Sequence, residues 1–268
     1  MLILIKGGGD LASGLASVLF SAGFGVVISE IEKPTTVRRA VSFSTAVFEK
    51  EHTVEGIKAR LCNNLEEVEN VLGNKEIPVI IDPGAKSVKD LKPEVVIDAI
   101  VAKKNVGTNI TDAPFVIALG PGFTAGVDCH CVIETNRGVS LGEVIYQGSA
   151  IPNTGIPGEL GGESVRRVLR AGATGVFCGV KQIGDNAQAG EVVAYVENSP
   201  IIAEISGVVR GMLMDGLMVK PHTKCGDIDP RGDVNLCYQI SDKAKQVGQG
   251  ALKAVLDYQE KKEIKGGV

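Results

Sequence analysis

The sequence has 268 residues, of which 44% are hydrophobic and 22% charged, with a formal net charge of −4. A chain of this length buries one large apolar core or two smaller ones. The chain is mildly acidic, has no block of basic residues and has an aromatic content of only 4%. These features disfavour a nucleic-acid-binding protein.

Nothing in the sequence resembles an export signal or a membrane span. The opening residues, MLILIKGGGD, lack a charged region ahead of their short apolar run. No apolar stretch approaches the roughly 20 residues that a membrane helix needs. We therefore expect a cytoplasmic protein that has no membrane contact and keeps its six cysteines reduced.

The first 30 residues predict a strand, a turn, a helix and a second strand. Residues 2–6 (LILIK) form the continuous apolar run of a buried parallel strand. Residues 11–19 carry apolar side chains at helical spacing, and Gly23 ends that helix. Residues 25–30 (GVVISE) form the second strand. This order is typical of the start of a Rossmann-like domain.

Further apolar strands alternate with loops and helices up to about residue 148. The predicted strands are residues 54–61, 78–83, 94–101, 114–119, 129–135 and 143–148. Residues 34–49 predict a loop and a helix, and residues 63–73 a helix capped by Asn63 or Asn64. The predicted fold class is therefore α/β, with a Rossmann-like, mainly parallel sheet domain over residues 1–165.

Residues 171–236 predict a second, all-β domain, because short β-like runs are split by turns. Residues 183–207 and 211–230 echo each other, which resembles the flattened barrel-sandwich of biotinyl and lipoyl carrier domains. The hairpin tip at residues 197–200 lacks an acceptor lysine. We expect this shape without an attached cofactor.

Two helices flank the predicted β domain. Residues 163–171 (ESVRRVLRA) predict a short helix before it. Residues 241–262 predict a C-terminal helix, capped by Ser241, that packs on the first domain.

The glycine-rich turn fits the pattern G-x-G-x-x-A from Gly7 to Ala12. Gly7 permits a tight turn, and Gly9 lets the backbone approach a phosphate at the start of the helix. Glu30 stands where a ribose-binding acid is expected. An empty connecting turn is the alternative. Asp10 beside the phosphate position repels an anion or caps the helix.

Other polar groups follow neighbouring strands and are expected at the same edge of the sheet. Thr36, Arg38 and Arg39 form a phosphate or carboxylate clamp, or a solvated surface that pairs with acids. The turn Gly120-Pro121-Gly122-Phe123 follows another strand. The loop that contains Asn153 and Thr154 is a binding loop or a linker.

Asp128-Cys129-His130-Cys131 suggests thiol chemistry. On a strand the two cysteines share one face and could hold a soft metal or handle sulfur or selenium. No second cysteine pair completes a zinc site, so we predict no metal. Buried core thiols are the alternative.

Motifs along nearly the whole chain resemble the YqeB-like accessory proteins of selenium-dependent molybdenum hydroxylases, and more loosely the XdhC-like proteins. They are KGGGDLASG (6–14), E-x-x-x-P-T-x-V-R-R (30–39), DAxxAKKNxGT (98–108), GPGFxAGxDCH (120–130), ETxRGxxLG (134–142), PNTGxPG (152–158), RVLRA (167–171) and GDIDPRG (226–232).

The resemblance implies an accessory role in maturing such a hydroxylase, which would be the partner. The protein would bind a nucleotide or a molybdopterin dinucleotide cofactor and deliver selenium or sulfur. The expected catalytic residues are Cys129, His130 and Asp128. The expected cofactor-binding residues are Gly7, Gly8, Gly9, Asp10, Leu11, Glu30, Thr36, Arg38, Arg39, Lys103, Asn105, Gly120, Gly122, Phe123, Asn153 and Thr154. A homo-oligomer is compatible with the sequence.

Two other functions stay open. An NAD-dependent oxidoreductase fits the glycine turn, and Glu30 favours NAD over NADP because it repels a 2′-phosphate. A non-catalytic scaffold that docks the hydroxylase fits the β domain.

Overall fold

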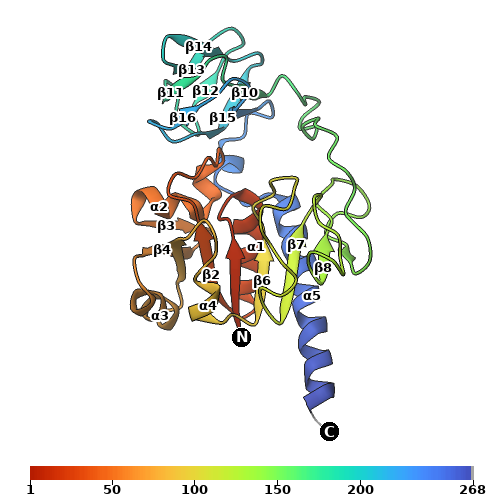
Figure 1. Cartoon of the computed structure of the whole chain (residues 1–268). Coiled ribbons are helices and arrows are strands. Elements are labelled where there is room, and N and C mark those ends of the chain that lie inside the picture. Colours follow the sequence, from red (N-terminus) through yellow and green to blue (C-terminus); the bar gives the residue numbers. More distant parts are fainter. Residues whose placement is uncertain (267–268) are drawn as a thin grey trace. The chain divides into compact units, whose positions relative to one another are not determined.

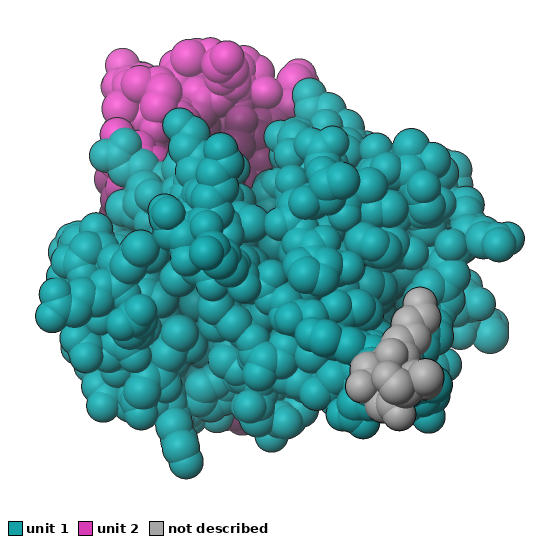
Figure 2. All heavy atoms as spheres, turned by 60° about the horizontal axis from the view of Figure 1, so that its bottom comes forward, with its two compact units in different colours: residues 1–32, 43–153, 241–268 teal, residues 33–42, 154–240 magenta. Residues whose placement is uncertain are grey.

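The structure, a computed structural model, describes residues 1–266 and divides into two compact units, coloured separately in Figure 2. Unit 1 consists of Met1–Glu32, Phe43–Asn153 and Ser241–Val268, and unit 2 of Lys33–Ser42 and Thr154–Ile240. Unit 2 is thus discontinuous in sequence, whereas the predicted domains are continuous. Its first segment lies inside the stretch predicted to form the first domain.

Unit 1 is built on a nine-stranded mixed sheet of order β3-β4-β5-β2-β1-β6-β7-β8-β9 (Figure 1). The strands are β1 (Leu2–Lys6), β2 (Gly25–Glu30), β3 (Glu51–Val54), β4 (Ile57–Cys62), β5 (Ile77–Ile81), β6 (Val95–Asp98), β7 (Phe115–Leu119), β8 (Cys131–Ile133) and β9 (Val144–Ile145). Neighbours from β4 to β8 are parallel, and β3 and β9 pair antiparallel at the two edges. The central strands are apolar because both faces of the sheet are covered.

Helices and loops cover this sheet. The helices of unit 1 are α1 (Asp10–Ser21), α2 (Ala46–Glu49), α3 (Leu65–Gly73), α4 (Val88–Leu91) and α5 (Asp242–Gly266), with the 3-10 helix η2 (Phe43–Thr45). The predicted cap of α3 is confirmed at Asn64, whose side chain accepts a hydrogen bond from the Glu67 amide at 2.9 Å. Ser241 Oγ likewise accepts from the Ala244 amide at 3.2 Å and caps the C-terminal helix.

Helices α1 and α5 pack against each other so closely that glycine is required at the contact. A Cβ on Gly14 would lie 2.5 Å from Cβ of Ala244, and one on Gly248 would lie 2.9 Å from Cγ2 of Val18. The amino-terminal part of one helix therefore faces the amino-terminal part of the other. The two helices run in the same direction, and their first turns are neighbours.

The predicted fold class is wrong for unit 1. A Rossmann-like domain alternates parallel strands with full helices, but here loops, with α4 as a single turn, connect β5 to β6, β6 to β7 and β7 to β8. The single strand predicted at residues 54–61 is part of a hairpin, β3 and β4, whose antiparallel pairing makes the sheet mixed. The turn of this hairpin uses left-handed Glu55 and Gly56.

Unit 2 contains two four-stranded antiparallel sheets, of order β10-β17-β15-β12 and β14-β13-β11-β16. The strands are β10 (Val168–Arg170), β11 (Gly175–Gly179), β12 (Asn186–Ala187), β13 (Val192–Val196), β14 (Ser199–Ile202), β15 (Gly207–Met212), β16 (Met218–Val219) and β17 (Lys224–Asp229). The 3-10 helices are η1 (Arg39–Val41) and η3 (Val234–Cys237). The predicted helix at 163–171 is wrong, because its last residues form β10 and pair with β17.

The biotinyl/lipoyl-like domain is also corrected. Such a carrier domain is one continuous segment, whereas unit 2 incorporates Lys33–Ser42 from the far end of the chain. The Val37 carbonyl accepts a hydrogen bond from the Met212 amide at 2.7 Å. A Cβ on Gly211 would lie 2.9 Å from the same carbonyl oxygen. The inserted segment is therefore an integral part of this unit.

Candidate functional site

The glycine turn between β1 and α1 lies at the carboxyl edge of the parallel strands. Gly7 has φ 91° and donates its amide to the Ser29 carbonyl at 2.8 Å. A Cβ on Gly7 would lie 3.2 Å from the Ala99 oxygen, so both conformation and space require glycine. Gly9 is the N-cap of α1, and no side-chain hydrogen bond caps the helix. A helix start of this kind favours a nearby anion.

Glu30 holds this turn from the end of β2. Its Oε2 accepts from the Gly8 amide at 3.0 Å and its Oε1 from the Ile31 amide at 2.8 Å. Burial raises the pKa of Glu30 above its usual value, although both amide hydrogen bonds oppose the shift. The acid predicted to bind a ribose therefore has backbone amides as its partners in this structure.

The first turn of α5 brings a lysine to the start of α1. Burial, and next the charge of Arg137, lower the pKa of Lys243, whereas the charges of Asp10 and Glu134 raise it. Lys243 therefore lies among acids at the paired starts of two helices. The sequence did not single it out, because a lysine in the first turn of a helix is usually solvated.

A second glycine turn and a loop continue the site along the same edge. Gly122 has φ 108°, and a Cβ there would lie 2.6 Å from the backbone nitrogen of Lys104. Asn105 Oδ1 accepts from the Thr108 amide at 2.8 Å. The structure thus brings Gly7, the 103–105 backbone and Gly122 into one row, as the sequence predicts for this edge.

Other residues of this second turn support the packing. Gly120 has φ 70°, and a Cβ there would lie 2.5 Å from Thr135 Oγ1. Phe123 is buried in an apolar cluster with Cys129. Leu11, in the first turn of α1, is half-buried. Phe123 therefore belongs to the core, and its ring is not presented to a ligand.

The two predicted clamp arginines lie in unit 2 and bind backbone carbonyls. Arg38 is 4% exposed and donates from Nη2 to Leu236 O at 3.1 Å and to Gln239 O at 2.9 Å. Arg39 Nε donates to Met212 O at 2.7 Å. Thr36 lies in the same segment. These interactions make the arginines structural residues of unit 2.

The Asp128–Cys131 segment is largely occupied by structural contacts. Asp128 accepts from the Thr124 amide at 2.7 Å and from Asn105 Nδ2 at 3.2 Å. Burial, with the charges of Asp128 and Asp98, raises the pKa of Cys129 to about 12. Burial likewise raises the pKa of Cys131 to about 12. Both thiols are protonated at neutral pH, which disfavours nucleophilic or metal-binding thiolate.

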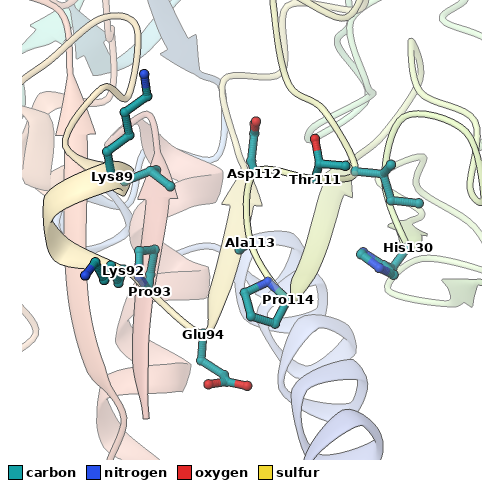
Figure 3. A pocket seen from close by; sticks show the side chains of 11 residues that line it. Lys89, Lys92, Pro93, Glu94, Thr111, Asp112, Ala113, Pro114 and His130 are labelled. Atoms are coloured by element: carbon teal, nitrogen blue, oxygen red, sulfur yellow. The ribbon is translucent and has the colours of Figure 1, made fainter.

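His130 lies away from the glycine turn. Its Nδ1 accepts from the Val116 amide at 3.0 Å, and burial lowers its pKa. The ring lines a groove of about 650 Å³ beside Glu94 and Pro114, which precede β6 and β7 and so mark the amino edge of these strands (Figure 3). In that view the charged ends of Lys89, Lys92 and Glu94 point in different directions, so they define no common ligand centre.

Asn153 and Thr154 are exposed at the junction of the two units in sequence. The Thr154 hydroxyl accepts from the Ile156 amide at 3.3 Å. Within residues 1–266, no group of three or more His, Cys, Asp or Glu side chains is arranged to hold a metal ion. Over the same residues, no helix has the length and apolar character needed to span a membrane.

Solved structures give weak similarities. An aspartoacylase family protein from Mesorhizobium loti has 13% identity and a TM-score of 0.24, with 85% of this chain and 83% of that chain covered. A succinylglutamate desuccinylase/aspartoacylase from Rhodobacter sphaeroides has 12% identity and a TM-score of 0.27, with 85% and 84% covered. Scores this low carry no conclusion about fold or activity.

The molybdenum and selenium chemistry expected from the resemblance is corrected, as are the predicted Rossmann-like and biotinyl/lipoyl-like domains. The name of the similar Escherichia coli protein mentions neither element. The buried, protonated Cys129 offers no exposed thiolate for selenium or sulfur transfer.

No family model matches the chain. A curated relative from Escherichia coli (strain K12), "Uncharacterized protein YqeB", is 49% identical over 255 residues, which are 95% of this chain and 47% of the relative. The chain therefore spans about half the length of the curated relative that it matches. The similarity to this relative extends over nearly all of the chain's own length.

Proposed function

We propose that the chain binds a small phosphate-bearing ligand at the carboxyl edge of the nine-stranded sheet. The observation that carries this proposal is the Gly7–Gly9 turn, which leads directly into the amino terminus of α1 with glycine as its N-cap residue. Backbone amides at such a terminus, reinforced by the helix dipole, favour a bound anion. Gly7 and Gly8 pack against the backbone of Ala99 and Ser44, which fixes the turn that leads into this terminus.

Two further features add positive potential at this place. The first turn of α5 lies beside that of α1, because Gly14 contacts Ala244. Lys243 lies where the first turns of α1 and α5 meet, and the exposed Lys103 and Lys104 lie on the neighbouring loop. Cations and helix starts that share one edge attract an anion more strongly than either alone.

Acids at the same place limit the total charge of the ligand. Asp10 lies in the first turn of α1, and Glu30 Oε2 accepts from the turn itself. The charge of Asp10 interacts with that of Lys243, which offsets part of the repulsion that an incoming phosphate meets. A ligand with one or two phosphates suits this balance better than a polyanion.

The proposal covers binding alone. Cys129 is a buried thiol, and His130 lines the groove at the amino edge of the sheet. Neither provides a nucleophile or a base at the glycine turn. An accessory role in hydroxylase maturation, as implied by the resemblance, stays a prediction that neither the structure nor the comparisons test, and so does NAD binding.

Isothermal titration of the full chain with pyrophosphate, ADP and NAD⁺ tests the proposal. We expect at least one of these ligands to bind, and Lys243→Gln to weaken that binding about tenfold, or about 1.4 kcal/mol. Lys253→Gln is the matched control, because it removes the same charge from an exposed position on the same helix. Absence of binding by all three ligands, or equal weakening by both variants, would contradict the proposal.

A further inference from the structure

The loop between β6 and β7 has an unusual backbone at residues 99–108. Val101 has φ 57° and Lys103 has φ 63°. Left-handed backbone is disfavoured for residues with a side chain, and most of all for a β-branched one such as valine. Two such residues this close together persist only where the surroundings hold them, as is common at ligand-binding segments.

A buried chain of hydrogen bonds anchors the far end of this loop. Lys6 Nζ, at the end of β1, donates to Thr108 Oγ1 at 2.6 Å, and Thr108 Oγ1 donates to Asp98 at 2.6 Å. These three residues are 5%, 2% and 1% exposed. Lys6 and Asp98 face each other in the register of β1 and β6. The hydroxyl of Thr108 thus joins two buried opposite charges on adjacent strands.

Two more contacts fix the middle and the start of the loop. Asn105 Nδ2 donates to the Thr108 carbonyl at 2.8 Å and to Asp128 at 3.2 Å. Asp98 Oδ1 accepts from the Ile100 amide at 3.1 Å. The backbone at Ala99 and Ile100 touches Gly7, and the backbone at Lys104 touches Gly122. The loop therefore lies directly between the two glycine turns.

We propose that Lys6, Thr108 and Asp98 are positioning residues, which hold the 99–108 loop in its strained form so that it binds a second anionic group of the ligand. This inference rests on the proposed phosphate site at Gly7–Gly9. The loop contributes the exposed Lys103 and Lys104. A ligand of two linked phosphates would place one at the start of α1 and the other against this loop.

A burial-only role for the three residues explains less. Left-handed non-glycine residues also occur singly at turns of this chain, as at Glu55 and Lys92, but within residues 1–266 only Val101 and Lys103 stand two positions apart. Apolar residues at positions 6, 98 and 108 would close the core without a buried charge pair. In the structure, a buried lysine, a buried aspartate and a hydroxyl instead stabilise one loop conformation. Preorganisation of this kind strengthens ligand binding because the ordering cost is met before binding.

Comparison of phosphate with pyrophosphate tests the inference on the full chain. We expect the parent protein to bind pyrophosphate at least tenfold more tightly than phosphate. Thr108→Val should abolish that preference, leave phosphate affinity within twofold, and speed hydrogen exchange at residues 99–108 without changing β1 or β6. Thr108→Ser, which keeps the hydroxyl, should restore both readouts. Thr111→Val, an exposed threonine beyond the loop, is the matched control.

The outcomes separate the two proposals. A parent protein that binds neither ion overturns this inference, and the absence of ADP and NAD⁺ binding as well overturns the proposed function with it. Equal affinity for the two ions, or a preference that survives in Thr108→Val, overturns the inference alone. Should Thr108→Val fail to fold, the double variant Lys103→Gln/Lys104→Gln, which changes exposed side chains, must lose the pyrophosphate preference by itself. Retention of the preference in that variant also overturns the inference.

Discussion

At the scale of single residues, the environment of each thiol decides whether it can react. Cys129 is fully buried and packs in an apolar cluster with Phe123 and Ala118, and burial is the largest cause of its raised pKa. Cys178, on β11, is exposed. Alkylating reagents attack the exposed thiolate form of cysteine. Burial blocks their access to the sulfur, and a high pKa keeps the thiol protonated, so both slow alkylation.

Alkylation of the native protein should therefore discriminate among the cysteines. With iodoacetamide at pH 8, we expect Cys178 to be modified first, while Cys129 and Cys131 stay unmodified until the chain is unfolded in urea. Mass spectrometry of the digested protein measures the order. Modification of Cys129 at the rate of Cys178 would contradict the buried, protonated thiol and would reopen a role in sulfur transfer.

Sequence pattern alone predicted the glycine turn well and the charged groups around it poorly. Gly7 and Gly122 were predictable because their positions in the chain follow buried strands. Arg38 was predicted at the ligand edge, but its partners are carbonyls nearly 200 residues away. Lys6 was treated as part of an apolar strand, because nothing local marks Thr108 as its partner. Long-range hydrogen bonds decide these roles, and one sequence does not contain them.

At the scale of elements, the sheet β10-β17-β15 is joined by charges as well as by backbone pairing. Asp227 on β17 is 1% exposed and binds Arg167 and Arg210 through its two oxygens. Burial by itself would raise the pKa of Asp227, but the charges of Lys224, Arg210 and Arg167 outweigh it and hold the pKa below the usual value. The ionised carboxylate is therefore the form that the folded unit stabilises.

This lowered pKa makes the stability of unit 2 depend on acid. Because the folded pKa is below the unfolded one, the contribution is present above the ordinary aspartate pKa of about 3.9 and is lost as pH falls through the folded value. Asp227→Asn should lower the stability at pH 7 by about 3–5 kcal/mol, because the buried Arg167 and the half-buried Arg210 lose the carboxylate that they share.

Thermal unfolding between pH 3 and pH 7 measures both effects. The parent should lose stability below pH 4, and Asp227→Asn should lose less over the same range. Asp185→Asn is a suitable control, since Asp185 lies at an exposed position of the same unit, where its carboxylate accepts from the Gln182 amide at 2.8 Å. An identical acid dependence in the parent and in Asp227→Asn would disprove the assignment.

The sequence predicted helices and strands correctly where the local pattern was long. The prediction failed where pairing with a distant strand determined the element. The α3 helix has its cap, its apolar spacing and its length in one segment, and all were predicted. Residues 163–171 have helix-forming side chains, but the Arg167 carbonyl accepts from the Ile228 amide at 2.8 Å and draws the segment into a sheet. Strand formation depends on such partners more than on intrinsic preference.

At the scale of the whole chain, the two units are interleaved in sequence. Chain order assigns residues 33–42 to the strand-rich first part, yet they belong with residues 154–240. Arg38 explains this assignment, because its guanidinium satisfies the carbonyls of Leu236 and Gln239 where η3 ends. No composition change marks residues 33–42, so neither end of this segment could be predicted as a domain boundary from the sequence.

This interleaving predicts that a substitution near the amino terminus weakens the unit formed by the distant half of the chain. Arg38→Met removes two charged hydrogen bonds to the Leu236 and Gln239 carbonyls, each worth about 1.5–3 kcal/mol. The loss should lower the protection of β15 and β17 against hydrogen exchange. Amides of β1 and β2, closer in sequence but in unit 1, should keep theirs. Lys33→Met, at an exposed position of the same segment, is the control. Faster exchange in β2 than in β15 would show instead that residues 33–42 belong to unit 1, since exchange follows the unit that loses its contacts and not the distance along the chain.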